Sequence, residues 1–244
     1  MIPVYAMNYA EITFRAKNPV KRWLQQQRLI SAIKLYGGSM RTPEAICDFG
    51  AGNGELCKLL TENYPNTKLI CYEPAPHLLM EARQNLSVFA KVEFCENINN
   101  VTRGTFGVVF CLEVFEHLPP TETVNVLETI FDLLKPGGKI VIGIPVEIGF
   151  PAFYKGVFRM LNRYGAFDAN LKNIALSTFR HPPKNRPINY IAPGFRYHFE
   201  HMGFDYRNFE EIIINYFKLQ KKSFSPSAKF GSWLMPEVYF LAEK

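Results

Sequence analysis

The chain has 244 residues and a formal net charge of +6, a length that suits one α/β domain with a large core. No apolar stretch approaches the roughly 18 residues that span a bilayer, and the first residues lack a secretory pattern, so we expect a cytoplasmic protein. The five cysteines show no metal-ligand spacing, and four of them fall in or beside expected core strands, where cysteine is an ordinary apolar residue.

The positive charge is unevenly distributed along the chain. Seven Lys or Arg and no acid lie between Ile12 and Pro43, and eight lie between Pro151 and Tyr197 against Asp168 alone. Two interpretations stay open. The runs are a solvated surface, or they form a basic, aromatic-rich lid that attracts an anionic substrate or lies against an anionic membrane.

The first expected element is a helix over residues 19–36, within an N-terminal helical extension over 1–43. Asn18-Pro19 resembles a cap and first helical position, and Gly37-Gly38 a stop. Trp23, Ile30 and Ile33 mark its expected buried stripe.

A strand over 45–48 then leads through a glycine turn into a helix over 54–63. Gly50, Gly52 and Gly54 permit a sharp turn with a ligand pressed against bare backbone. The spacing is not the G-x-G-x-x-G of dinucleotide-binding proteins. Asp48 would repel a pyrophosphate, whereas it suits a ligand that carries an ammonium group and a sulfonium centre, namely S-adenosylmethionine.

The second half of such a site is an acid at the end of the next strand, about 20 residues further on, which binds ribose hydroxyls. Glu73 occupies this position. It follows an expected strand over 68–72, and Pro74 leads into an expected helix over 76–86.

These motifs, with Leu134-Lys135-Pro136-Gly137-Gly138 further on, resemble those of class I S-adenosylmethionine-dependent methyltransferases. The resemblance covers roughly residues 40–145 and the last 40. It implies a Rossmann-like, doubly wound α/β sheet of seven strands in the order 3-2-1-4-5-7-6. It also implies that S-adenosylmethionine is the cofactor and S-adenosylhomocysteine the product. The implied cofactor-binding residues are Asp48, Gly50, Ala51, Gly52, Asn53, Glu73, Pro74, Asn97, Cys111 and Leu112.

The third strand is expected over 91–95 and the fourth over 107–111. In the family, an acid after the third strand commonly binds the adenine amino group. Here the matching position is Glu96, Asn97 or Ile98, of which we favour Asn97. The fourth strand is not followed by an Asp/Asn-Pro-Pro-Tyr-type sequence, which argues against methylation of exocyclic base amines or glutamine amides.

A helix over 121–134, capped by Thr121, and a strand over 139–144 complete the alternation. Residues 146–192 interrupt it, where the family commonly places substrate-binding insertions, and an amphipathic helix fits 152–164. We expect this insertion to be a substrate lid, with peripheral membrane contact through 150–164 as an alternative. A helix from about 205 to 216 and strands over 218–224 and 238–242 close the single domain over 1–244.

The segment Glu113 to His117 is the expected catalytic region. His117 is the best candidate for a general base toward a hydroxyl acceptor, because its unperturbed pKa is near neutrality. Glu113 or Glu116 could orient it or act instead. Alternatively, Glu116-His117 only caps the following segment.

Glu113-x-x-Glu116-His117 also resembles a segment of ubiquinone-pathway O-methyltransferases and small-RNA 2′-O-methyltransferases, where Glu, Glu and His can hold a divalent cation. A second histidine is expected in the RNA enzymes, and His181, His198 and His201 are candidates. Glu-His at this position is also frequent in members without a metal. No metal is therefore assigned, and Glu113, Glu116 and His117 are the alternative ligand set.

The leading hypothesis is a methyltransferase acting on a small-molecule or lipid-linked acceptor, most readily by O-methylation. An anionic acceptor is the option that the positive charge favours. The alternatives are an RNA ribose 2′-O-methyltransferase and a methyltransferase-like binding protein without turnover. Nucleic acid is the less favoured partner. Nothing in the sequence indicates an oligomeric state.

Overall fold

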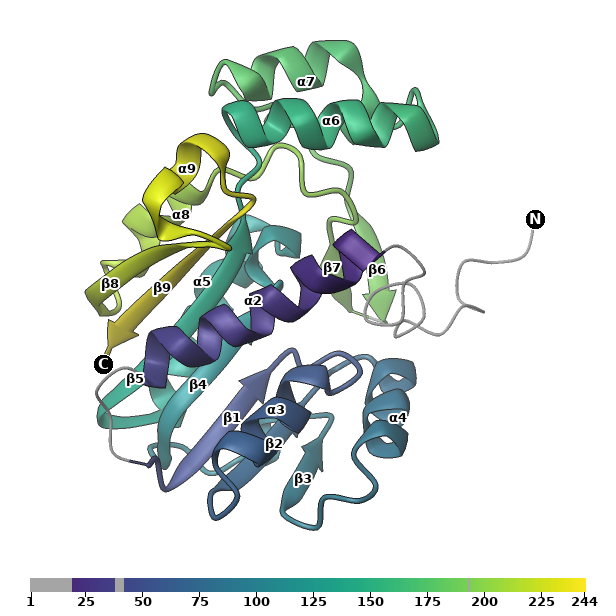
Figure 1. Ribbon diagram of the computed structural model, residues 1–244. Helices are drawn as coiled ribbons and strands as arrows, with labels where there is room; N and C mark the ends of the chain where they lie inside the picture. Colours follow the sequence, from purple (N-terminus) through teal and green to yellow (C-terminus); the bar gives the residue numbers. More distant parts are fainter. Residues whose placement is uncertain (1–18, 38–41, 193) are drawn as a thin grey trace.

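The computed structural model describes residues 19–37, 42–192 and 194–244 (Figure 1). The expectations for residues 1–18 and 38–41 of the N-terminal extension lie outside this part. No helix among the described residues is long and apolar enough to cross a membrane.

A seven-stranded sheet forms the centre, in the order β3-β2-β1-β4-β5-β9-β8. The first five strands in sequence are parallel, and β9 pairs antiparallel with both β5 and β8. This arrangement confirms the expected order 3-2-1-4-5-7-6. The strands are β1 (Ala45–Phe49), β2 (Lys68–Tyr72), β3 (Val92–Cys95), β4 (Phe106–Leu112), β5 (Leu134–Pro145), β8 (Lys218–Ser225) and β9 (Glu237–Glu243).

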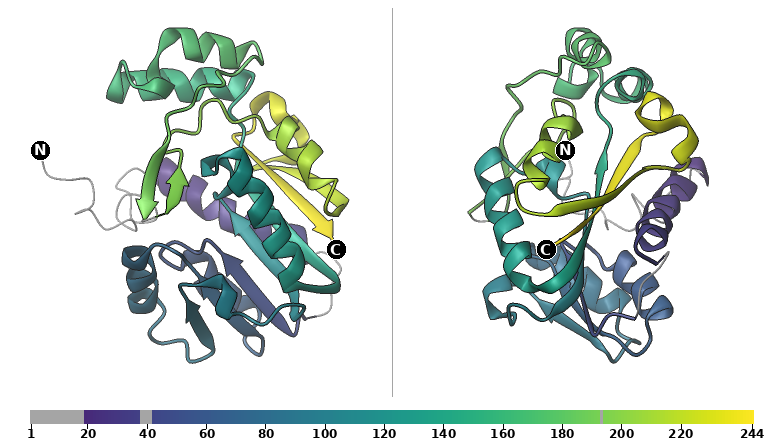
Figure 2. Two further views of the ribbon diagram at one scale, coloured as in Figure 1. Left: turned by 180° about the vertical axis from the view of Figure 1, so that it is seen from behind. Right: turned by 90° about the vertical axis from the view of Figure 1, so that its left-hand side faces the viewer.

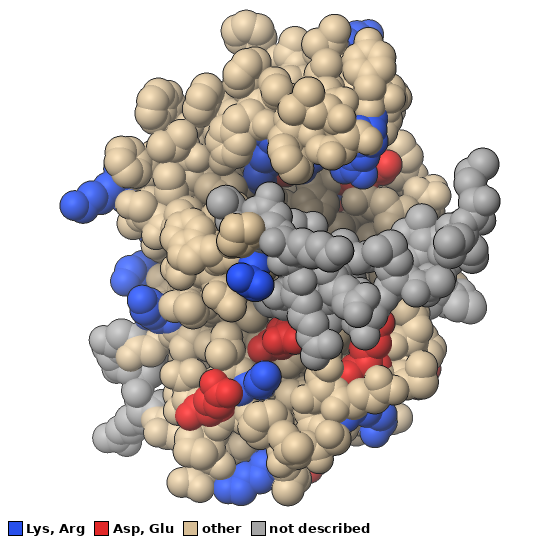
Figure 3. All heavy atoms as spheres, turned by 45° about the vertical axis from the view of Figure 1, so that its right-hand side comes forward, with Lys and Arg blue, Asp and Glu red and all other residues tan. Residues whose placement is uncertain are grey.

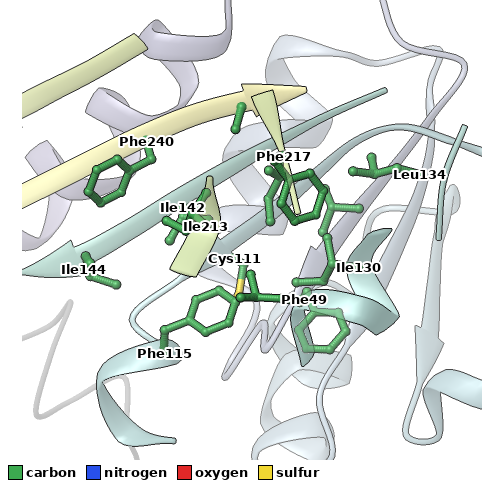
Figure 4. Packing of buried hydrophobic residues seen from close by; sticks show 14 of the residues in the cluster. Phe49, Cys111, Phe115, Ile130, Leu134, Ile142, Ile144, Ile213, Phe217 and Phe240 are labelled. Atoms are coloured by element: carbon green, nitrogen blue, oxygen red, sulfur yellow. The ribbon is translucent and has the colours of Figure 1, made fainter. Parts of the chain in front are cut away.

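Helices cover both faces of the sheet (Figure 2). On one face lie α2 (Pro19–Gly37), α3 (Glu55–Asn63) and α4 (Pro76–Asn85); on the other lie α5 (Pro120–Leu133) and α8 (Tyr206–Ile213). Successive strand residues alternate between the two cores: Ile46, Val108 and Val141 face the first set of helices, and Cys47, Val109 and Ile142 face the second. Figure 4 shows Ile130 and Ile213 from the helices of the second face packed against the sheet.

The buried side of α2 differs in part from the expected stripe. Ile30 and Ile33 are half-buried, and Ile33 packs against the core as expected. Trp23 is 47% exposed, and the fully buried residues are Ala32, Leu35 and Tyr36. The inward face runs through Arg28, whose guanidinium is bound by Glu113 and Glu237. The expected orientation of α2 rested on the positions of its apolar residues. Because Arg28 is a charged residue on the side that faces the core, that pattern did not identify the buried side correctly.

Further differences concern element ends and the region after β5. Helix α5 begins at Pro120 with Pro119 as its N-cap, so Thr121 is not the cap, and β5 begins at Leu134 rather than at residue 139. Beyond β5 the chain forms α6 (Phe150–Arg163), α7 (Leu171–Thr178), a separate hairpin of β6 (Asn189–Ala192) and β7 (Phe195–Tyr197), and later α9 (Gly231–Leu234). Only α6 among these was expected, at 152–164.

Candidate functional site

The glycine turn joins the ends of β1 and β2. The amides of Gly50 and Ala51 both donate to the carbonyl oxygen of Tyr72 at 2.9 Å. All three glycines have positive φ. A Cβ on Gly50 would lie 2.5 Å from Cγ2 of Val114, whereas a Cβ on Gly52 would meet nothing within 4 Å. The turn is therefore packed at Gly50 and open at Gly52, where a ligand can approach the backbone.

Glu73 ties the two strand ends together. One carboxylate oxygen accepts from the Gly52 amide at 2.8 Å, and the other accepts from the Ala75 amide at 2.9 Å. Burial raises the pKa of Glu73, and these two amides partly oppose that shift. The predicted pair of the glycine turn and the acid after β2 is thus brought together, with Pro74 between the acid and Ala75.

Asp48 lies at the end of β1, 2% exposed. Its Oδ2 accepts from the Sγ–H of Cys57 at 3.2 Å. Burial raises the pKa of Asp48 to about 7, and the nearby charge of Glu73 adds to the rise. Two acids in one buried corner favour a cation beside them, and the ammonium and sulfonium groups of S-adenosylmethionine supply one.

The other expected cofactor residues are distributed around this corner. Asn53 is buried, and its Nδ2 has no hydrogen-bond partner among the described residues. Asn97 accepts from the amide of Asn99 at 3.0 Å, so its side chain caps a short helix. A cavity of about 960 Å³ extends along β2 and β3, from Lys68 at the amino end of β2 to Pro74 and Asn97 beyond the carboxyl ends of the strands. Only its end at Pro74 and Asn97 lies beside the glycine turn and Glu73.

The two residues that end β4 differ in access. Cys111 is fully buried and lies beside Phe115 in the core, so only its backbone can face a ligand (Figure 4). Leu112 is half-buried. Burial raises the pKa of the Cys111 thiol well above its usual value, which leaves it inert as a nucleophile.

The Glu113 carboxylate contacts Arg28 and not His117, its expected partner. Glu113 has a left-handed backbone, with φ of 56°, and its carboxylate pairs with Arg28 at 2.9 Å. Arg28 also binds Glu237 at 2.5 Å, which links α2, the end of β4 and β9. Glu113 is therefore a partner of Arg28, and the structure does not bring it to His117. Glu116 is the acid beside His117.

The His117 ring is fixed by its surroundings. It stacks on Tyr197 with ring centroids 4.2 Å apart, and its Nδ1 lies 2.6 Å from the carbonyl oxygen of His198. Because a carbonyl only accepts, Nδ1 carries the proton and Nε2 keeps its lone pair as an acceptor. Burial lowers the pKa of His117 to about 4, so the ring is neutral at physiological pH.

His201 and Glu116 complete a cluster around that lone pair. Nε2 of His201 lies 3.2 Å from Nε2 of His117, and a carboxylate oxygen of Glu116 lies 3.9 Å from it. The Glu116 carboxyl group is fully buried, neither oxygen has a hydrogen-bond partner among the described residues, and burial raises its pKa to about 8. A buried carboxyl group without partners is costly unless it is protonated or binds a cation.

The cluster has the donors of a divalent metal site. One ligand atom each from Glu116, His117 and His201 lies within 4.8 Å of the others. Two histidine nitrogens bound tetrahedrally at about 2.0–2.1 Å from zinc would lie about 3.3 Å apart, close to the separation here. The group replaces Glu113 of the expected ligand set by His201. Of the other two histidine candidates, His198 presents its carbonyl oxygen to His117, and His181 is exposed.

The glycine turn and the histidine cluster are directly connected. Val114 packs against Gly50, and the His117 amide donates to the Val114 carbonyl oxygen at 3.0 Å. Both groups lie where β1 and β4, neighbours in the sheet, reach their carboxyl ends. The order of strands reverses at this point, and open α/β sheets bind their ligands there.

Similar proteins indicate the family and the fold of the chain. The chain is 27% identical over 121 residues to carboxy-S-adenosyl-L-methionine synthase of Actinobacillus succinogenes, which covers 47% of this chain and 50% of the relative. It is 29% identical over 102 residues to ubiquinone biosynthesis O-methyltransferase of Xanthomonas axonopodis pv. citri, covering 40% of this chain and 41% of the relative. The matches thus span half or less of these relatives.

The fold matches that of solved methyltransferases. The N-methyltransferase NodS of Bradyrhizobium japonicum, solved in complex with S-adenosyl-L-homocysteine, aligns with a TM-score of 0.59 at 12% identity, over 93% of this chain and 89% of that one. A family model described as a methyltransferase domain matches residues 21–179. This match covers more than half of the chain, which therefore belongs to the methyltransferase domain family and has the fold of S-adenosylmethionine-dependent methyltransferases.

Proposed function

We propose that the chain transfers the methyl group of S-adenosylmethionine to a hydroxyl oxygen of a small-molecule or lipid-linked acceptor and releases S-adenosylhomocysteine. The observation that carries the proposal is the pairing of two sites. Asp48 and Glu73 form an acidic corner beside the open face of Gly52. His117, whose Nε2 faces Nε2 of His201 at 3.2 Å, lies on the segment packed against the same turn.

The methyl group on a sulfonium is already activated, so the protein mainly has to hold the acceptor in line and exclude water. A hydroxyl acceptor must still lose its proton. A neutral imidazole with Nδ1–H bonded to the His198 carbonyl oxygen can accept that proton on Nε2 once the acceptor displaces the contact with His201. Burial, which lowers the pKa of His117 to about 4, makes it a weak base in the chain without ligands. The imidazolium then formed would be held by the same carbonyl.

The donor set of Glu116, His117 and His201 supports a second way to activate the acceptor. A divalent cation bound by these residues would lower the pKa of an acceptor hydroxyl. The chain's contribution would then be to hold the ion and to orient His117 through its stacking on Tyr197. His117 cannot be both a metal ligand and a free base, so metal binding distinguishes the two roles.

The oxygen specificity rests on the character of this site and on the similarity to the ubiquinone biosynthesis O-methyltransferase. RNA ribose 2′-O-methylation is the second candidate, because His201 supplies the second histidine expected for enzymes of that kind. It requires an affinity for RNA that falls steeply with salt. A binding protein without turnover is the third candidate.

Two experiments test the proposal. Calorimetry with S-adenosylmethionine and S-adenosylhomocysteine measures cofactor binding, and the proposal fails if neither binds. Incubation of a lipid and metabolite extract with methyl-labelled cofactor then identifies the acceptor. Label in an ether or ester methyl group supports O-methylation, label in ribose favours the RNA reading, and absence of label from every component favours the binding protein.

A further inference from the structure

Helix α6 carries an apolar stripe on its solvent side. Phe150, Phe153, Val157 and Leu161 recur at intervals of three and four, and Phe158 lies beside Val157, which places them along one side of the helix. All five are exposed, Leu161 to 81%. Tyr164, the residue that follows the helix, is 74% exposed. Such a row is unusual for a helix surrounded by water.

Neighbouring elements extend this row into one surface. Helices α7 and α9 both pack against α6. Trp233 of α9, 66% exposed, stacks on Phe150 with ring centroids 5.8 Å apart. Leu171 and Phe179, at the two ends of α7, are 62% and 76% exposed. We call this surface of α6, α7 and α9 the lid patch; it lies at one end of the molecule (Figures 1 and 2).

The charged side of α6 points inward instead. Lys155 lies 3.1 Å from the buried carboxylate of Glu147, and Arg159 binds the same carboxylate through two hydrogen bonds of 2.7 and 2.8 Å. The pKa of Glu147 is lowered well below its usual value by these two cations, against the effect of burial. Ion pairs hold the helix to the body, while its apolar side is left outward. This is the reverse of an ordinary surface helix.

The charges around the lid patch are cationic. Lys172, Arg180, Lys184 and Lys229 are exposed. Residues 148–192 contain a single acid, Asp168, which is fully buried, and residues 226–236 contain none. In Figure 3 most of the end of the molecule formed by α6 and α7 is tan, and some Lys and Arg side chains lie on it.

Exposed apolar side chains surrounded by cations indicate which kind of partner covers the lid patch. We propose that the lid patch docks on an anionic lipid bilayer, with its aromatic and aliphatic side chains at the acyl boundary and its cations at the headgroups. A second copy of the chain fits less well, because an isologous contact would place these like charges opposite each other. Helix α6 begins soon after Pro145, where β5 ends, so docking would bring the carboxyl edge of the sheet close to the bilayer.

Docking through the lid patch does not depend on the identity of the methyl acceptor. The test is flotation of the whole chain with vesicles of phosphatidylcholine alone or mixed with phosphatidylglycerol. We expect binding to the mixed vesicles, weakened by salt. The double variant Phe153→Ser/Leu161→Ser should bind them at least about tenfold more weakly, because it removes two inserted side chains. Met80→Ser/Val88→Ser is the matched control, since both residues are exposed but lie outside the lid patch.

A second measurement is tryptophan fluorescence of a chain whose lid patch is unchanged. Trp23→Phe leaves Trp233 as the single tryptophan, and its emission should shift to the blue on addition of mixed vesicles. Absence of binding and of this shift overturns the proposal, as does equal loss of binding in the control variant. A dimer in sedimentation that the Phe153→Ser/Leu161→Ser variant dissociates also overturns it, in favour of a second copy. Calorimetry with S-adenosylmethionine on the same variants tests the cofactor site separately.

Discussion

His117 and His201 meet through their Nε2 atoms at 3.2 Å, although they are 84 residues apart in the sequence. The His198 carbonyl oxygen holds the proton of His117 on Nδ1, so the two rings can share one N–H···N hydrogen bond or one metal ion. The buried Glu116 carboxyl group, 3.9 Å from Nε2 of His117, favours the ion, because both of its oxygens lack a hydrogen-bond partner among the described residues.

The first prediction is that the chain binds one Co²⁺ with the intense visible absorption of a tetrahedral site. His201→Ala should lose at least about tenfold in Co²⁺ affinity, since it removes one of three protein ligands. His181→Ala is the control, because His181 is exposed and its Nδ1 contacts only the Phe179 carbonyl oxygen. Equal Co²⁺ spectra and affinities in both variants would reject a metal site and leave His117 as a base.

The second prediction concerns Glu73. Each of its oxygens accepts one backbone amide, and a glutamine can accept only one of them while turning an N–H toward the other. Glu73→Gln should therefore lower the free energy of unfolding by roughly 1–3 kcal/mol in urea titrations. Its affinity for S-adenosylmethionine should fall at least about tenfold by calorimetry.

Glu44→Gln is the control for this change. Glu44 lies just before β1, and its carboxylate forms an exposed ion pair with Lys135 at 3.2 Å. Loss of an exposed pair costs little. If the two variants have the same cofactor affinity, Glu73 does not bind the cofactor.

The sequence carried enough information for the sheet and for the first half of the site. Buried strands are short apolar runs, and parallel pairing with right-handed crossovers leaves few orders, so β1 to β5 and the placing of Glu73 opposite Gly52 followed from local pattern. The cluster around His117 could not be predicted from local pattern. The β6–β7 hairpin brings His198 and His201 back to the end of β4, and its strands of four and three residues are too short to show a periodic pattern.

Backbone and charge explain the other errors. Glu113 was expected to orient His117, to act instead of it or to join it as a metal ligand. Its left-handed backbone and its ion pair with Arg28 place its carboxylate elsewhere. Buried ion pairs of this kind join elements far apart in the chain, and no spacing rule within one element predicts them.

The third prediction concerns the packed side of the glycine turn. Gly50→Ala places a methyl group 2.5 Å from Cγ2 of Val114 at a φ of +79°, so strain and overpacking should together cost about 2–5 kcal/mol of unfolding free energy. Adding Val114→Ala should recover the overpacking part in a double-mutant cycle. Gly52→Ala meets no atom within 4 Å, so it should cost less stability yet weaken S-adenosylmethionine binding. A larger stability loss in Gly52→Ala than in Gly50→Ala would contradict this account of the turn.

The last prediction is a pH dependence of stability that originates at Asp48. Burial raises its pKa from 3.8 to about 7, so the folded chain holds a proton that the unfolded chain releases between these values. The favourable contribution of this group is fully present below pH 4 and is lost as the pH rises through 7. Asp48→Asn should therefore lose less stability than the wild type between pH 5 and pH 8 in urea titrations.

The affinity for S-adenosylmethionine should rise over the pH range in which stability falls. An ionised Asp48 attracts the ammonium group of S-adenosylmethionine, so the affinity of the wild type should rise as the pH approaches 7 and fall above about 8, where an α-amino group loses its proton. Asp48→Asn should lose the rising limb and keep the falling one. Asp132→Asn, in which an exposed acid is changed, is the control. Glu73 also titrates in this corner, so the quantity to compare is the difference in S-adenosylmethionine affinity between wild type and Asp48→Asn at each pH. If the two affinity profiles run parallel across this pH range, binding of the cofactor does not depend on the Asp48 carboxylate.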